Sequence, residues 1–339
     1  MDWVHDRKVL PLPGATFGRL INVDDAETFA GAVEQVPDVL PALLCEAGGL
    51  LILKGMGAIS GQPELLVRLS HPFGTEVEDY ALTSNRDNLL HPASSQIIRI
   101  SNRPPMSFEP PEPPDPPRTA SGELPVRFPH RRGWHTDQSF RRPPPDISLF
   151  YAHEPAPRDQ GQTLYADGTG AWERLDDELA AVTENLVGIH VAPFKGHGED
   201  DVREGREPQV LNERDGPQPQ PVVRVHPVSG RRALYLCERE QMDWIHGPFA
   251  GMEPGVDGEA ARLLYRLMRH FTQPALTYAH HWDKGDLVIY DNRCTIHSAT
   301  WFDAAKHNRD MWRTTVWGNP GPFYDGEARS WEGGSIHDV

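Results

Sequence analysis

Short runs of β-branched and apolar residues, each bounded by glycine or a turn signal, recur along this chain and most constrain its fold. The clearest runs are ATFGRLINV, GGLLILKG, SQIIRIS, PVVRVHPVSGRRALYL, GDLVIYDNRCTIHSATW and MWRTTVWG. The fourth contains two β-rich halves around a Ser-Gly turn, which predicts a hairpin. We interpret the last two as one strand each. A chain with this many strands is expected to be built mainly from β-sheet.

Helical periodicity is confined to a few segments. Apolar residues at helical spacing predict helices over 26–47, 62–69 and 260–271. The sequence contains neither a GxGxxG motif nor a P-loop, so nothing in it favours a nucleotide-binding parallel sheet. We therefore predict a mainly β fold with added helices and a barrel or sandwich core. No internal repeat is present, and we expect a single domain over 1–339.

A proline-rich segment interrupts this pattern. Residues 104–117, PPMSFEPPEPPDPP, contain eight prolines, which excludes a central strand or a helix interior. We treat 104–132 as a loop inserted into the domain. Two interpretations stay open: a solvated excursion, or a lid over a pocket, since long loops in compact domains are often functional.

Charge and composition restrict the partners and the compartment. A formal net charge of −16 argues against non-specific binding to nucleic acid or to an anionic membrane. The longest apolar runs are far shorter than the roughly 20 residues needed to cross a bilayer. Three widely separated cysteines suit reduced thiols, and the N-terminus lacks the pattern of a secretory signal. We expect a cytoplasmic protein that binds a small molecule. The protein could form a dimer or tetramer.

The segment GWHTDQSF contains the first candidate metal ligands. Residues two apart in a strand point to the same side, so His135 and Asp137 could bind one metal. A rival pair, His281 and Asp283, has the same spacing. With 16 histidines in the chain, one such pair arises by chance, so either pair alone is more readily explained as structural.

The predicted C-terminal strands make a metal site at His135 and Asp137 more favourable than a structural role. His297 lies beside a predicted strand and is followed by Arg309 and Arg313, which would share one face of a strand over 309–317. Two guanidinium groups on an inward face are costly unless they pair with anions, and a bound dicarboxylate supplies them. Two imidazoles and one carboxylate can hold a divalent iron and leave three coordination positions open.

In these motifs the chain resembles the taurine dioxygenase (TauD/TfdA) family of iron(II)- and 2-oxoglutarate-dependent dioxygenases. The family pattern is His-x-Asp, a long interval, His, and then an arginine some eleven to fourteen residues later. Here these positions are His135, Asp137, His297 and Arg309. The likeness also extends through GGLLILKG, GQTLYAD and PVVRVHPVSGRRALYL, so it covers most of the chain.

The resemblance implies a double-stranded β-helix (jelly-roll) core and a specific site. Iron(II) would be bound by His135, Asp137 and His297, and would use 2-oxoglutarate and O2 to oxidise a C–H bond, giving succinate and CO2. Thr163 and Arg309 would hold the distal carboxylate of 2-oxoglutarate. Because the spacing from His297 is one residue longer than in the taurine enzyme, Arg309 and Arg313 could exchange roles.

The substrate residues depart from those of the taurine enzyme. The resemblance places Arg313 at the acid group of the prime substrate and Arg131 where that enzyme has an asparagine. Glu78 or Asp79 falls near its sulfonate-binding histidine. Taurine is therefore not expected to be the substrate. An anionic or zwitterionic small molecule would suit the arginines, with Glu78 and Asp79 holding an amine.

Other interpretations of the same residues stay open. Desaturation or cyclisation uses the same three ligands, and a metal-dependent hydrolase or isomerase could bind zinc or manganese through them. A non-catalytic jelly-roll binding protein is a third class. We expect His281 to pack or to bind a backbone group, His197 to be solvated, and Asn292 to fix a turn near the metal by side-chain hydrogen bonds.

Overall fold

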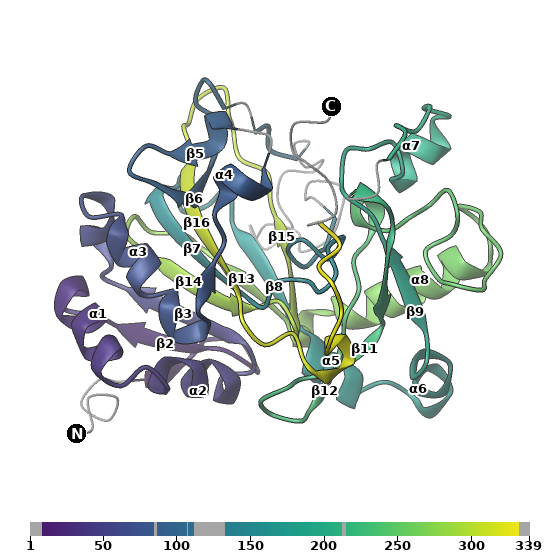
Figure 1. Ribbon diagram of the computed structural model, residues 1–339, viewed down its shortest axis with the longest axis horizontal. Helices are drawn as coiled ribbons and strands as arrows, with labels where there is room; N and C mark the ends of the chain where they lie inside the picture. The colour runs from purple at the N-terminus through teal and green to yellow at the C-terminus, as the bar shows by residue number, and fades with distance from the viewer. Residues whose placement is uncertain (1–8, 85–86, 107, 112–132, 212–214, 332–339) are drawn as a thin grey trace.

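The computed structural model describes residues 9–84, 87–106, 108–111, 133–211 and 215–331 (Figure 1). Its strands are β1 (Val9–Pro11), β2 (Arg19–Asn22), β3 (Leu50–Lys54), β4 (Glu76–Val77), β5 (Leu90–His91), β6 (Ser94–Ser101), β7 (Ile147–Glu154), β8 (Thr163–Asp167), β9 (Val187–His190), β10 (Gln218–Pro221), β11 (Val223–Val225), β12 (Arg232–Leu234), β13 (Thr277–His280), β14 (Leu287–Asp291), β15 (Thr295–Ala299) and β16 (Asp310–Trp317). Its α-helices are α1 (Ala26–Gln35), α2 (Val39–Glu46), α3 (Glu64–Arg68), α4 (Tyr80–Thr83), α5 (Gly168–Glu173), α6 (Asp177–Thr183), α7 (Glu199–Arg203) and α8 (Glu259–Phe271).

Two sheets build the centre of the molecule. The larger has the order β1-β2-β3-β14-β7-β16-β6-β5, with β4 paired to β16, and the smaller has the order β13-β8-β15. Except for the parallel pair β2 and β3, neighbouring strands run antiparallel. This order places β14, β7 and β16 side by side, although they come from distant parts of the chain.

The alternation of side chains along β3 shows how the layers are stacked. Leu51 and Leu53 belong to the core cluster that includes Phe29 of α1, on the side where α1, α2 and α3 cover the large sheet (Figure 1). Leu50 and Ile52 instead belong to a second cluster, together with Tyr165 of the small sheet. The large sheet is therefore buried on both faces, which explains why β3 reads as a continuous apolar run.

The far side of the small sheet is covered by helix. Leu164 of β8 and Ile296 of β15 belong to a third cluster, which contains Leu264, Leu267 and Phe271 from the apolar face of α8. Two sheets packed face to face, with helices outside them, form the predicted mainly β fold with a jelly-roll core. That prediction is confirmed.

Two expectations about individual elements were wrong. The helix predicted over 26–47 is two helices, because Val36, which precedes Pro37, leaves the helical region with φ −137°. The segment expected to form one strand after residue 286 is two strands, β14 and β15, joined by a turn after Asp291. Within the described ranges no helix is both long enough and apolar enough to cross a membrane.

Gly55, which follows β3, provides a test of this packing. Its φ is +90°, and a Cβ atom added there would lie 2.0 Å from the carbonyl oxygen of Val23. Gly55→Ala should therefore lower the free energy of unfolding by more than about 2 kcal/mol, because it adds a backbone clash to the strain of positive φ. Urea denaturation followed by circular dichroism measures this loss.

The matched control is Gly14→Ala. Gly14 also has positive φ, +76°, but a Cβ atom there would meet nothing within 4 Å. Its loss should be limited to the strain of the left-handed conformation, about 1 kcal/mol. Equal losses at the two positions would contradict the packing described for Gly55.

Candidate metal and cosubstrate site

His135 and His297 are brought together by backbone pairing. His135 forms an isolated antiparallel bridge with His297 of β15: the His135 amide donates to the His297 carbonyl at 3.0 Å, and the reverse bond is 2.7 Å. The two imidazole centroids lie 4.3 Å apart. The predicted ligand atoms of His135, Asp137 and His297 all lie within 4.8 Å of one another. The three candidates thus meet at one point, as the sequence predicted.

Both histidines are in a form that suits a metal ligand. The Nδ1 atom of His135 lies 2.9 Å from the Gly133 carbonyl, which can only accept, so Nδ1 carries the proton and Nε2 keeps its lone pair. Burial, followed by electrostatic repulsion from His135 whenever that ring is protonated, lowers the pKa of His297 to about 3, although Asp137 opposes this shift. His297 is therefore neutral near pH 7, as metal coordination requires.

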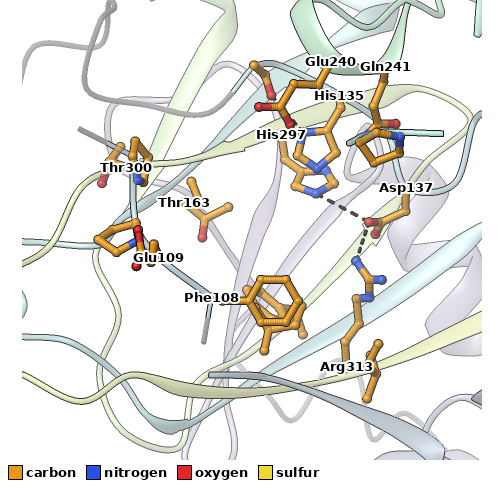
Figure 2. A pocket seen from close by; sticks show the side chains of 18 of the residues that line it. Phe108, Glu109, His135, Asp137, Thr163, Glu240, Gln241, His297, Thr300 and Arg313 are labelled. Atoms are coloured by element: carbon orange, nitrogen blue, oxygen red, sulfur yellow. Dashed lines mark hydrogen bonds and ion pairs between the residues drawn. The ribbon is translucent and has the colours of Figure 1, made fainter. Parts of the chain in front are cut away.

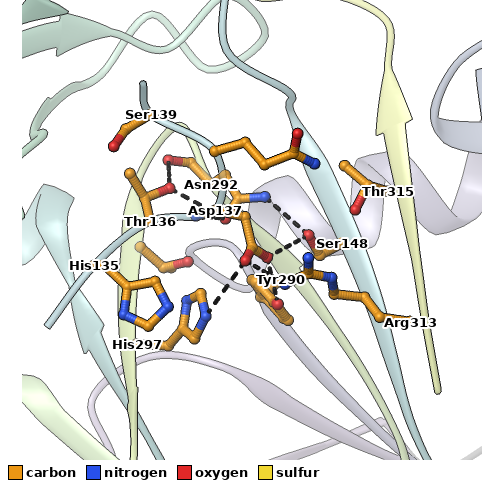
Figure 3. Close-up of polar contacts among 12 residues, drawn as sticks. His135, Thr136, Asp137, Ser139, Ser148, Tyr290, Asn292, His297, Arg313 and Thr315 are labelled. Carbon is orange, nitrogen blue, oxygen red and sulfur yellow. Dashed lines mark hydrogen bonds and ion pairs between the residues drawn. The ribbon is translucent and has the colours of Figure 1, made fainter. Parts of the chain in front are cut away.

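The carboxylate of Asp137 is fixed by two hydroxyl groups (Figure 3). Its Oδ2 atom accepts hydrogen bonds from Tyr290 at 2.6 Å and from Ser148 at 2.8 Å. Tyr290 and Ser148 are directly opposite each other on β14 and β7, so their side chains converge on the same face of the sheet. Burial, with the charge of Asp137, raises the pKa of Tyr290 well above its usual value, so the phenol keeps its proton and donates.

The other oxygen of Asp137 faces the histidines and an arginine. Oδ1 lies 3.8 Å from Nε2 of His297 and forms an ion pair with Nη1 of Arg313. Burial alone would raise the pKa of Asp137, but the charge of Arg313, together with the two histidines, holds it below its usual range. Asp137 is therefore a carboxylate with one oxygen immobilised and the other turned towards the cluster of candidate ligands.

Asn292 fixes the segment that contains Asp137. Its side-chain oxygen accepts from the backbone amide of Asp137 and from the Thr136 hydroxyl, each at 3.1 Å. Its amide nitrogen donates to Ser148 at 3.1 Å. The predicted role of Asn292 in fixing a turn by side-chain hydrogen bonds is confirmed, and its bond to Ser148 links the turn to the group that holds Asp137.

A cavity of about 330 Å³ opens beside these residues (Figure 2). Thr163, Arg309 and Arg313 all line it, as do the described loop residues Phe108–Pro111. Thr163 lies across the cavity from Arg313, which is next to Asp137 (Figure 2). Arg309 is buried, and its guanidinium carbon lies 5.7 Å from the ring centroid of Phe150. The cavity therefore contains both predicted arginines and the predicted threonine.

Thr163 is itself positioned by a neighbour. Its hydroxyl accepts a hydrogen bond from the indole nitrogen of Trp282 at 3.0 Å, and its side chain is buried. Because the indole uses one lone pair of this oxygen, the hydroxyl proton stays available for donation to an acceptor in the cavity.

Two of the predicted substrate residues are not brought to the cavity. Asp79 is not among its described lining residues and instead caps α4, accepting from the Ala81 amide at 3.1 Å. Glu78 is buried in an ion pair with Arg141 at 3.0 Å and accepts from Gln138 at 2.6 Å. The structure therefore gives no support to an amine held by Glu78 and Asp79. Arg131 lies outside the described residues.

Of the remaining histidines, one behaves as predicted and one does not. His281 is exposed, and its Nδ1 lies 3.0 Å from the Arg158 carbonyl, so it binds a backbone group as expected. His197, expected to be solvated, is buried and lies 3.3 Å from the carboxylate of Asp243. That expectation was wrong because Asp243 supplies a buried polar partner from a distant segment.

The two hydroxyl groups that hold Asp137, those of Tyr290 and Ser148, were not predicted from the sequence. Tyr290 precedes Asn292 by two positions in LVIYDN, so strand alternation could have placed both on the face of the metal site. Nothing comparable signals Ser148. Its role depends on the register between β7 and β14, which pairs it with Tyr290.

Comparison with known proteins assigns the chain to a family. The model of the taurine catabolism dioxygenase TauD, TfdA family matches residues 9–315. The chain belongs to the TauD/TfdA family. This match spans every predicted site residue and both sheets apart from the last two residues of β16.

Several similar proteins carry the names of alpha-ketoglutarate-dependent dioxygenases. The (S)-phenoxypropionate/alpha-ketoglutarate-dioxygenase of Sphingobium herbicidovorans is 34% identical over 193 residues, 56% of this chain and 63% of that protein. Pentalenolactone F synthase of Streptomyces arenae is 25% identical over 332 residues, 95% of this chain and 99% of that protein. The alignments with the phenoxypropionate and dichlorophenoxyacetate enzymes span about three-fifths of those proteins.

A solved structure shares the fold over almost the whole chain. It is AAD-2 in complex with Mn(II) and N-oxalylglycine, with 27% identity and a TM-score of 0.68. The superposition covers 92% of this chain and 98% of AAD-2. The jelly-roll assignment therefore rests on both the sheet order and this similarity.

The ion pair between Arg313 and Asp137 leads to a stability prediction. Arg313→Gln should lower the free energy of unfolding by about 3–5 kcal/mol at pH 7, because it leaves a buried carboxylate without its cation. The lowered pKa of Asp137 means that the contribution of the pair is complete above about pH 4 and is lost as the pH falls below it. Urea unfolding in EDTA, from pH 7 to pH 3, measures both effects.

The control is the double variant Arg313→Gln with Asp137→Asn, which replaces the ion pair by two neutral amides. It should recover part of the stability lost in Arg313→Gln, and the mutational loss should no longer shrink in acid. A single variant as stable as the wild type, or a double variant with the summed loss, would show that the pair is not coupled.

Proposed function

We propose that the chain is an Fe(II)- and 2-oxoglutarate-dependent dioxygenase that oxidises, by hydroxylation, a C–H bond of a small molecule. The observation that supports this most is the meeting of His135, Asp137 and His297 beside a cavity lined by Arg309 and Thr163. Membership of the TauD/TfdA family and the names of its relatives support the same activity.

The donor set fits a divalent iron. Two imidazoles and one carboxylate, converging from one side, are the ligands typical of iron(II) oxygenases with open coordination positions. Asp137 would bind through Oδ1, because Tyr290 and Ser148 occupy Oδ2. The hydrogen bond from His135 to Gly133 would orient its ring, as partners of metal-bound histidines commonly do.

Arg309 and Thr163 are the proposed binding groups for 2-oxoglutarate. A buried guanidinium pairs strongly with a carboxylate because two parallel N–H groups match its two oxygens. The Thr163 hydroxyl adds a donor, while its bond from Trp282 keeps it in place. When bound, the iron and 2-oxoglutarate would supply O2-dependent oxidation, with 2-oxoglutarate converted to succinate and CO2.

Arg313 is the proposed contact for an acidic group of the prime substrate. It lines the cavity next to Asp137, and its Nη1 is engaged by that carboxylate. The predicted zwitterionic substrate loses its support at the amine, since Glu78 is paired with Arg141 and Asp79 caps α4. An anionic substrate remains our proposal.

Oxidation with a different outcome is the second candidate. Desaturation or ring formation needs the same metal ligands. Similarity over 95% of the chain to a protein named a pentalenolactone F synthase supports an oxidation of this kind in a biosynthetic pathway. A hydrolase or isomerase using zinc or manganese has less support, because the family match and the names of the relatives favour 2-oxoglutarate-dependent oxidation. Consumption of 2-oxoglutarate with iron and ascorbate separates the hydrolase or isomerase from both kinds of oxidation, and mass spectrometry of the product separates hydroxylation from desaturation or ring formation.

The metal assignment predicts the effect of removing single ligands. His135→Ala, Asp137→Ala and His297→Ala should each weaken Mn(II) binding on the order of 100-fold or more, since even groups that only orient a ligand contribute 10–100-fold. Isothermal titration calorimetry measures the affinity, and 2-oxoglutarate turnover should disappear in parallel. The control is His281→Ala, which removes an exposed imidazole bonded to a carbonyl. Full Mn(II) binding by the His297 variant would refute the assignment.

The cosubstrate assignment predicts an unequal response of the two arginines. Arg309→Lys should weaken 2-oxoglutarate binding by about 2 kcal/mol or more, roughly 30-fold, because an ammonium cannot reproduce the planar fork. The matched control is Arg313→Lys, for which the change should be several-fold smaller. Titration of 2-oxoglutarate into the anaerobic Mn(II)-loaded proteins measures both. The reverse order would mean that the two arginines exchange roles.

A further inference from the structure

One part of the cavity wall is apolar. Ile98 and Ile100 of β6, together with Phe108, Phe140 and Phe194, line it, and each keeps part of its side chain accessible. Five accessible apolar side chains around one cavity form a surface that water solvates poorly. We call these five residues the apolar wall.

The register of β6 explains why the apolar wall lies next to the metal site. Ile98 is directly opposite Arg313 of β16, and Ile100 is opposite Met311. Because side chains alternate along a strand, Ile97 points into the core on the other face and is fully buried. These two isoleucines of the wall are therefore fixed by the large sheet, beside the arginine that pairs with Asp137.

Phe194 is the member of the apolar wall with a strained backbone conformation. Its φ is +64°, a left-handed conformation that is rare and costly for a bulky residue. The residue is also 55% exposed, and it lines the cavity. Strain of this kind persists where the surrounding structure enforces it, and it gathers at ligand sites. Keeping an exposed aromatic ring in a strained conformation suggests a contact with a ligand.

The acidic groups around the cavity are already engaged. Glu78 pairs with Arg141. Glu109, Glu238 and Glu240 line the cavity, and each has an interaction within the chain. Asp137, which also lines the cavity, is paired with Arg313. An ammonium group entering the cavity would lose its hydration and would have to compete with these existing contacts for a carboxylate, which is unfavourable.

We propose that the prime substrate presents a ring-sized apolar body without a cationic group to the apolar wall, and that Phe194 is a specificity-determining residue. This inference rests on the proposed function and names the class of substrate for that site. A cavity of about 330 Å³ that also admits 2-oxoglutarate leaves room for a single small ring system. Contact with the apolar wall would stabilise such a body in proportion to the apolar area removed from water.

The test uses two probes that differ by one amino group. They are cyclohexanecarboxylate and trans-4-aminocyclohexanecarboxylate, which share the ring and the acid group. Both are titrated calorimetrically into the anaerobic protein loaded with Mn(II) and 2-oxoglutarate. Cyclohexanecarboxylate should bind at least about tenfold more tightly, because the ammonium is desolvated and would have to compete with existing contacts for a carboxylate.

Variants assign this preference to the wall. Phe194→Gly removes the ring and also relieves the positive-φ strain, so the protein should be no less stable than the wild type while the preference falls to about threefold or less. Phe194→Leu should restore most of it. The matched control is Phe323→Ala, because Phe323 is 56% exposed and does not line the cavity, and the preference should be unchanged.

The outcomes separate this inference from the proposed function. If the wild-type protein fails to bind Mn(II) and 2-oxoglutarate, the proposed function fails, and this inference fails with it. If Mn(II) and 2-oxoglutarate bind normally, three results would overturn the inference alone. Neither probe binds, or trans-4-aminocyclohexanecarboxylate binds as tightly as cyclohexanecarboxylate, or Phe194→Gly keeps the full preference for cyclohexanecarboxylate. A preference that is lost in Phe194→Gly and kept in Phe323→Ala supports it.

Discussion

The burial of one carboxylate, Asp137, organises the candidate site. An isolated buried carboxylate is strongly disfavoured, so the fold must supply donors and positive charge around it. It does so from three neighbouring strands, with Tyr290 from β14, Ser148 from β7 and Arg313 from β16. These strands adjoin in the large sheet although they come from distant parts of the chain. The strand order is thus the means by which Asp137 can be both buried and ionised.

The same arrangement gives the two oxygens of Asp137 different roles. Tyr290 and Ser148 can only fix Oδ2, whereas Oδ1 faces His297 and Arg313. A carboxylate held in this way has little freedom to rotate, so its position relative to the two imidazoles is set before any ligand binds. Preorganisation of this kind lowers the cost of assembling a metal site, because the ligand groups are not ordered at the moment of binding.

The sequence pointed to the three candidate ligands that the structure brings together, but it pointed less well to their surroundings. His135, Asp137 and His297 could be proposed because their chemistry is local and their spacing matches a family pattern. Apolar runs such as GGLLILKG also located most strands, since a strand buried on both faces leaves a strong signal. The break at Val36 was missed, although Pro37 is a local signal for it. Ser148 could not be found, because its contact with Asp137 depends on the register between two strands.

The substrate side was harder to predict for a related physical reason. Glu78 looked available in the sequence, but its charge is neutralised by Arg141 from a distant segment. Charge that is visible in a sequence is therefore no guide to charge that a ligand meets.

Backbone conformation differs between residues that line the cavity and residues that hold the candidate metal ligands. Among the described residues, the non-glycine positions with positive φ are Gln138, Phe194 and Arg239. The first two line the cavity, and Arg239 lies between the lining residues Glu238 and Glu240. His297 and the groups that hold Asp137 lie instead on regular strands. Strands fix His297 and the groups that hold Asp137, whereas Phe194, the strained member of the apolar wall, lies outside the strands. Changes to the loop around Phe194 can therefore alter the shape of the cavity without displacing the candidate metal ligands.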